Sequence, residues 1–110
     1  MQNNKDKQIV HLKEMFKEHL AIPFPQVTLN GELQGIRGEI SLYGGHVAGL
    51  VTSYLNSAPI NPDYVKVDAE LEERIKNFKP GNSQEKKDIA VLMEYKHKLD
   101  SLLLLLSTLL

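Results

Sequence analysis

Histidine and carboxylate side chains give this chain its only obvious means of acid–base chemistry, and one histidine follows two glycines. In the motif Gly44-Gly45-His46, His46 is a candidate general base. Such a base needs a carboxylate to orient it, and Glu32 and Glu39 are the candidates, although their spacing selects neither. The competing interpretation is a tight turn at the two glycines, next to which the histidine has no special role.

The glycine-rich middle of the chain also suggests two binding hypotheses. Arg37, Tyr43 and His46 define a candidate ligand site for a small molecule or a substrate. Gly35 and Gly38 have the spacing of the Gly-x-x-Gly loop that clamps RNA, but that loop joins two helices and no basic, aromatic patch surrounds this one. The two glycines are more typical of a bulge or a close strand crossing.

Two pairs of residues have the spacing of metal ligands on a helix. His11 and Glu14, and likewise Glu94 and His97, are three residues apart, as in the bundles that bind two iron ions. One pair has the reverse order, and solvated surface histidines are the simpler explanation. With no cysteine in the chain, thiol catalysis and disulfides are excluded as well. We therefore expect neither a metal nor a cofactor.

The charge of the chain disfavours a strongly electrostatic partner. Its 110 residues include 13 Lys and Arg against 14 Asp and Glu, a net charge of -1. Sequence motifs that bind nucleotide phosphates or dinucleotides are missing. Nucleic-acid binding remains a third hypothesis, and it rests on four lysines of the last predicted helix: Lys86, Lys87, Lys96 and Lys98.

The C-terminal leucines are the most unusual feature of the sequence. Leu102–Leu106 are consecutive, and the whole apolar stretch covers nine residues, far fewer than the roughly 20 that a spanning helix needs. Five leucines in a row point all round a helix, so some would face water unless something covers them. We expect a homodimer, with burial in the chain's own core or a membrane-surface contact as alternatives. The candidate dimer interface is Leu99, Leu102, Leu103, Leu105, Leu106 and Leu109.

The order of the predicted elements is helix, sheet, helix. A helical apolar stripe covers residues 4–21. Asn30-Gly31 lies between two short β-prone runs, 26–29 and 32–34, and is typical of a hairpin turn. A strand follows over 35–43. Residues 46–55 fit a third strand or a helix, and we favour the strand because Gly49 would weaken a helix.

Helical patterns resume after a loop. Asn61 and Pro62 are a typical helix entry, and Pro80-Gly81 ends the segment. Asn82 with Glu85 resembles a capping box for a last helix over 83–107. We thus predict one α+β domain, 1–110, in which an N-terminal helix and two C-terminal helices cover a three-stranded antiparallel sheet. The expected core is Ile9, Leu12, Phe16, Leu20, Val27, Leu29, Ile36, Ile40, Leu42, Val47, Leu71, Ile75, Phe78, Leu92 and Leu99.

These features favour a small, non-enzymatic interaction or regulatory protein, although they do not decide whether the chain is an enzyme. We expect a cytoplasmic protein of prokaryotic type, without a membrane partner, that forms a homodimer through its Leu-rich C-terminal helix. It could also offer the acidic run 68–73 to a basic protein. A small-molecule or enzymatic site around the glycine-rich segment is the alternative, and weak nucleic-acid binding is the third.

Overall fold

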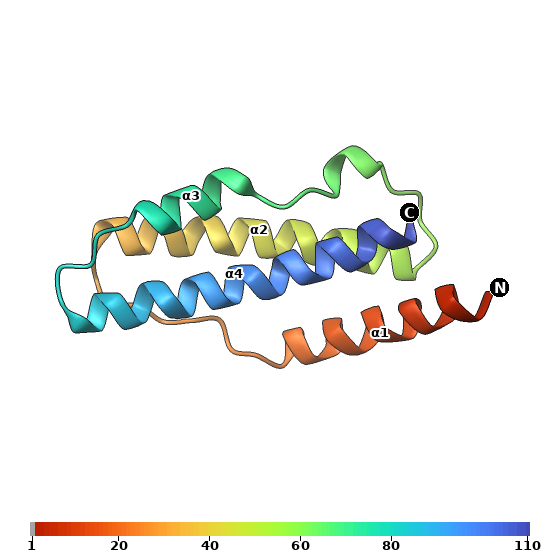
Figure 1. Ribbon diagram of the computed structural model, residues 1–110, viewed down its shortest axis with the longest axis horizontal. Helices are drawn as coiled ribbons and strands as arrows, with labels where there is room; N and C mark the ends of the chain where they lie inside the picture. The colour runs from red at the N-terminus through yellow and green to blue at the C-terminus, as the bar shows by residue number, and fades with distance from the viewer. Residues whose placement is uncertain (1) are drawn as a thin grey trace.

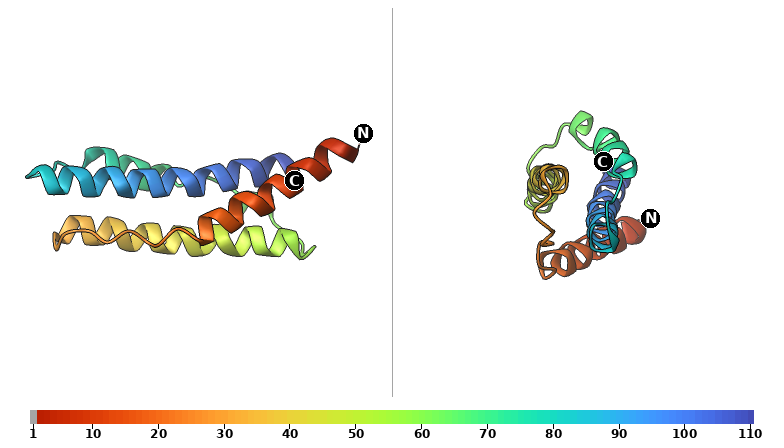
Figure 2. Two further views of the ribbon diagram at one scale, coloured as in Figure 1. Left: turned by 90° about the horizontal axis from the view of Figure 1, so that it is seen from below. Right: turned by 90° about the vertical axis from the view of Figure 1, so that its left-hand side faces the viewer.

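The computed structural model describes residues 2–110, and over this range the chain contains helices and no strand. Figure 1 shows that α2 and α4 run side by side in the same direction, whereas α1 and α3 run the opposite way. Figure 2 shows α1 crossing the pair at an angle. The elements are α1 (Gln2–Leu20), α2 (Gly31–Leu55), a 3-10 turn η1 (Pro62–Tyr64), α3 (Ala69–Asn77) and α4 (Ser83–Leu109).

The core lies mainly between α2 and α4. Both helices bury residues at intervals of three and four, the spacing that puts side chains on one helical face. Leu12 of α1 and two residues of α3, Leu71 and Ile75, are buried in the same core. On α2 the buried residues are Leu33, Ile36, Ile40, Tyr43, Val47 and Val51, and the apolar ones on α4 are Leu92, Leu99, Leu102, Leu103, Leu106 and Leu109.

The expected α+β fold with its three-stranded sheet is wrong, because the pair Asn30-Gly31 begins a helix instead of turning a hairpin. The Asn30 side-chain oxygen accepts hydrogen bonds from the backbone N–H groups of Glu32 and Leu33, at 2.9 and 3.1 Å. Asparagine is a preferred residue at this capping position. No glycine among residues 2–110 has the positive φ that a type I′ hairpin turn requires.

Residues 35–55 follow the helical period of about 3.6 residues instead of the period of two that a strand would have. Ile36, Ile40 and Leu42 share a face only in a strand, whereas Ile36, Ile40 and Tyr43 share one in a helix. The structure has the helix, and Leu42 is 78% exposed on its opposite side. The helical alternative for residues 46–55 is therefore correct, and the preferred strand is wrong.

Two further residues of the expected core lie at the surface. Leu20 is the last residue of α1 and is 64% exposed, and Leu29 is 96% exposed in the extended segment before the Asn30 cap. Leu20 stands at the very end of its helix, and the sheet that was expected to bury Leu29 does not form. The helix expected after Asn61 is also divided, into η1 and α3, with Asp68 as the N-cap of α3.

The C-terminal leucines fill the chain's own core. Leu99, Leu102, Leu103, Leu106 and Leu109 are at most 5% exposed, and Leu105 is partly buried against them. This arrangement is the intrachain alternative to the expected dimer interface, and it leaves Leu104 and Leu110 as the exposed leucines of the tail. None of the helices described in residues 2–110 has the length and apolar character needed to cross a membrane.

Neighbouring leucines of this tail give a direct test of the packing. Leu103→Ala removes a side chain that is 1% exposed and should lower the free energy of unfolding by about 2–5 kcal/mol. Leu104→Ala removes one that is 59% exposed and should change it by less than about 1 kcal/mol. Urea denaturation followed by circular dichroism measures both, and equal losses would contradict the burial pattern.

Candidate functional site

A buried lysine lies at the contact of α2, α3 and α4. Lys96 is a charged residue within the apolar stripe of α4, and it is only 1% exposed. Its ammonium nitrogen lies 3.0 Å from Glu72 Oε1 on α3 and 2.9 Å from Asp100 Oδ2 one turn along α4. The hydroxyl of Tyr43 on α2 donates to Asp100 Oδ1 at 2.5 Å. We call these four residues the Lys96 network.

The electrostatics of the network favour its charged form. Burial alone would lower the pKa of the Lys96 ammonium, but Asp100 and Glu72 raise it, and the net direction is upward. The hydrogen bond from Lys96 lowers the pKa of Glu72 to about 2. Burial, followed by the hydrogen bond to Asp100, raises the pKa of Tyr43. The Lys96 ammonium thus lies buried between two acidic side chains and donates a hydrogen bond to each.

The same carboxylates form the one possible metal-binding cluster found in the described part of the chain. Ligand atoms of Glu72, His97 and Asp100 lie within 4.8 Å of one another. His97 Nε2 is 3.2 Å from Glu72 Oε1, and the Lys96 ammonium hydrogen-bonds to both carboxylates. Because that ammonium already supplies the positive charge, the geometry fits an internal ion pair better than a metal centre.

The candidate ligand site of Arg37, Tyr43 and His46 is not assembled as one cluster. Arg37 donates from Nε to the backbone oxygen of Pro25 at 2.6 Å and lies over the Phe24 ring, 4.6 Å from its centroid. The Tyr43 hydroxyl turns inward to the Lys96 network, and His46 Nε2 lies 2.9 Å from the backbone oxygen of Tyr64. Each side chain has a separate structural partner.

Tyr43 and His46 nevertheless line one groove between α2 and α3, and Arg37 does not. The groove has a volume of about 580 Å³ and is bounded by Leu42, Leu71 and Arg74 among others. Glu32 and Glu39, the carboxylates considered for orienting His46, instead form ion pairs with Arg74. The hydrogen-bond partner of His46 is the Tyr64 carbonyl, and neither of these two carboxylates orients its ring.

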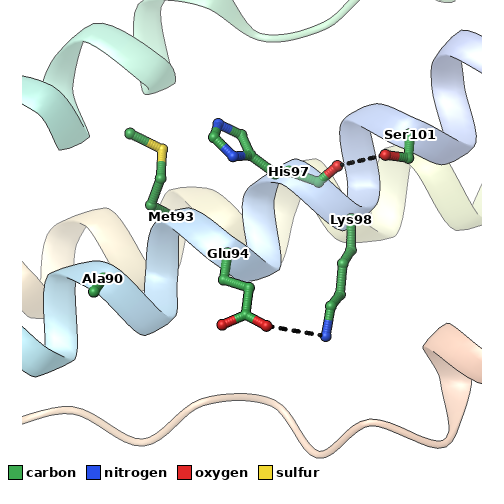
Figure 3. Close-up of a pocket in the computed structure, with 6 residues that line it drawn as sticks. All are labelled: Ala90, Met93, Glu94, His97, Lys98 and Ser101. Carbon is green, nitrogen blue, oxygen red and sulfur yellow. Dashed lines mark hydrogen bonds and ion pairs between the residues drawn. The ribbon is translucent and has the colours of Figure 1, made fainter.

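The lysines considered for nucleic-acid binding do not form a common basic surface. Lys96 is buried, and Lys98 lies 3.6 Å from Glu94. Figure 3 shows the outer face of α4 around this pair, where Glu94 and Lys98 point toward one another and His97 points away. Carboxylates thus neutralise two of the four lysines that the hypothesis needed.

The exposed face of α2 carries glycines that no contact within the described chain requires. Gly38, Gly45 and Gly49 lie along it, and a Cβ atom added at any of them would meet nothing within 4 Å. Gly35 differs, because its Cβ would lie 2.7 Å from the Arg74 guanidinium. Leu42 stands among the three open glycines and is 78% exposed. We call Gly38, Leu42, Gly45 and Gly49 the α2 glycine face.

Comparisons with known proteins do not add a family to this picture. No protein-family model matches the chain, and no curated protein or solved structure is significantly similar to it. The class that the structure itself defines, over residues 2–110, is a bundle of four α-helices that alternate in direction.

Removing the charge of Lys96 should be far more costly than removing a surface lysine. Lys96→Met leaves Glu72 and Asp100 without their buried cation and should lower the free energy of unfolding by about 3 kcal/mol or more. Lys98→Met breaks only an exposed pair with Glu94 and should cost less than about 1 kcal/mol. Urea denaturation at pH 7 compares the two variants.

A triple variant separates the charge effect from lost packing. Adding Glu72→Gln and Asp100→Asn to Lys96→Met removes the unpaired carboxylates and should recover part of the lost stability. If the triple variant is less stable than Lys96→Met alone, the unpaired carboxylates are not the cause of the loss.

The same network should make the chain sensitive to acid. Because Glu72 has a folded pKa of about 2 against an ordinary 4.5, its contribution is complete above pH 4.5 and is lost as the pH falls toward 2. Denaturation midpoints measured between pH 5 and 2.5 should therefore fall less steeply for Glu72→Gln than for the natural chain. Parallel slopes would show that Glu72 is not responsible.

Proposed function

We propose that this protein acts by binding other protein surfaces through the α2 glycine face, and that its first partner is a second copy of itself. The observation that carries this proposal is the set of three open glycines around the exposed Leu42. Neither of the alternatives from the sequence has comparable support, because the ligand residues separate and the basic residues are partly neutralised.

The three glycines lower the stability of the α2 helix, and no contact within the chain requires them. Glycine in a helix interior is less favourable than alanine by roughly 1 kcal/mol, so Gly38, Gly45 and Gly49 together cost about 3 kcal/mol. No neighbouring atom of the chain prevents a methyl group at these positions. The absence of side chains at these positions would allow a partner helix to approach the α2 backbone closely, which increases packing contacts.

The order of residues on the face suits a two-fold symmetric contact. In an antiparallel pair of α2 helices centred between Tyr43 and Gly44, Leu42 of each copy lies opposite Gly45 of the other, and Gly38 lies opposite Gly49. Each Leu42 side chain then meets a glycine, and the two backbones can lie close together where Gly38 meets Gly49. This self-complementarity is what an interface between identical subunits requires, because the same patch must serve on both sides.

The triple variant Gly38→Ala, Gly45→Ala, Gly49→Ala should change stability and association in opposite directions. The added methyl groups favour the helix and should raise the free energy of unfolding of the monomer by about 2–3 kcal/mol. They also keep the two α2 backbones apart and should raise the dissociation constant at least tenfold. Denaturation of dilute samples measures the first, and sedimentation equilibrium measures the second.

A lysine introduced on the α2 glycine face, compared with one introduced on α4, tests whether association depends on this face. Leu42→Lys should abolish association, whereas Val91→Lys, which changes a 46% exposed residue of α4, should leave it unchanged. The proposal of self-association is wrong if the natural chain sediments as a monomer at millimolar concentration, or if the alanine variant associates as tightly as the natural chain.

A further inference from the structure

His19 is a buried histidine at the contact between α1 and α4. The residue is 9% exposed, and its ring centroid lies 4.9 Å from that of Tyr95. With Met15, Ile22 and Leu102 it lines a cavity of about 270 Å³. The Nδ1 atom of His19 is buried and has no hydrogen-bond partner. The contact of α1 with α4 is thus built around an imidazole with one unsatisfied polar atom.

Few charged groups surround this ring. The one on α4 is Lys98, and its positive charge disfavours protonation of the imidazole. The cavity is lined by α1, Ile22 and α4, and its charged groups besides His19 are Glu18 on α1 and Lys98 on α4. Lys98 is paired with Glu94, and Glu18 is exposed, so water and salt screen its attraction. Burial, followed by the charge of Lys98, lowers the pKa of His19.

We propose that His19 is a pH-sensitive contact, which holds α1 against α4 while the imidazole is neutral and releases α1 when the imidazole is protonated in mildly acidic solution. An imidazolium carries an N–H on both ring nitrogens, and the buried Nδ1–H would have no acceptor. A buried polar group without a partner, and a cation next to Lys98, both disfavour the docked state.

The position of α1 in the fold makes a local release reasonable. Among the described residues of α1, Leu12 is the one buried apolar residue, with Ile9, Met15 and Phe16 partly buried beside it, whereas α2 and α4 bury six apolar residues each. Residues 21–30 connect α1 to α2 without helical structure, and Figure 1 shows α1 lying along the C-terminal half of α4. Release of α1 would uncover Leu102 and its neighbours while the pairing of α2 with α4 persists.

The direction of the pH effect follows from linkage. The docked state disfavours the proton on His19, so the stabilisation of α1 is complete above the ordinary histidine pKa and is lost as the pH falls below it. The undocked helix takes the proton freely. At pH 5.0 the opening equilibrium of α1 should therefore increase by up to about thirtyfold, the limit for a docked state that takes no proton.

Amide hydrogen exchange at pH 7.5 and 5.0, corrected for intrinsic rates, tests this proposal. In the natural chain the protection of residues 8–20 should fall at pH 5.0 while that of α2 and α4 is kept. His19→Leu should keep α1 protected at both pH values. His11→Leu, which changes an exposed histidine of the same helix, should behave like the natural chain. His19→Gln is a second uncharged variant if His19→Leu does not fold.

Three results would overturn the proposal. Unchanged protection of α1 in the natural chain would show that protonation does not release it. Equal loss of protection in the folded His19 variant would assign the effect to other groups. Simultaneous loss in α1, α2 and α4 would show unfolding of the whole chain instead of a local release. The test does not involve the α2 glycine face, so its outcome is separable from that of the proposed self-association.

Discussion

The burial of a charged lysine among three helices is the constraint on which this structure most depends. The Lys96 ammonium is buried with two carboxylates within hydrogen-bond distance, those of Glu72 on α3 and Asp100 on α4. Tyr43 connects α2 to the same group through its hydrogen bond to Asp100. Breaking a buried ion pair by removing one partner is strongly destabilising, because the other charge is left uncompensated. The network thereby joins α2, α3 and α4 at one point.

α1 is outside this network, and it packs on the core through Leu12 and the partly buried Ile9, Met15 and Phe16. Its contact with α4 includes one fully buried leucine and a histidine whose Nδ1 has no partner. Three helices thus share a rigid ionic contact, and the fourth is attached by a group that can gain a charge. The proposed release at His19 therefore concerns α1, whereas the proposed self-association concerns the opposite, exposed side of α2.

Sequence patterns predicted the helical ends of this chain well and its middle poorly. The capping of the last helix by Asn82 was predicted from residue type and spacing, and the burial of Ile36, Ile40 and Val47 was predicted correctly although they were assigned to strands. Asn30-Gly31 was not, because the same two residues suit a hairpin and a helix start, and only long-range packing selects one. Lys96 interrupted an otherwise apolar stripe, and this interruption was the one available signal of the network, since Glu72 is distant in sequence.

The proposed association of two copies through antiparallel α2 helices is tested most directly by a distance between the copies. The chain lacks cysteine, so Thr52→Cys on α2 accepts a single nitroxide label, and pulsed electron paramagnetic resonance measures the separation in the dimer. An antiparallel contact centred between Tyr43 and Gly44 predicts a defined distance of roughly 25–30 Å. Absence of dipolar coupling, or the much shorter distance of a parallel pair, would contradict the account.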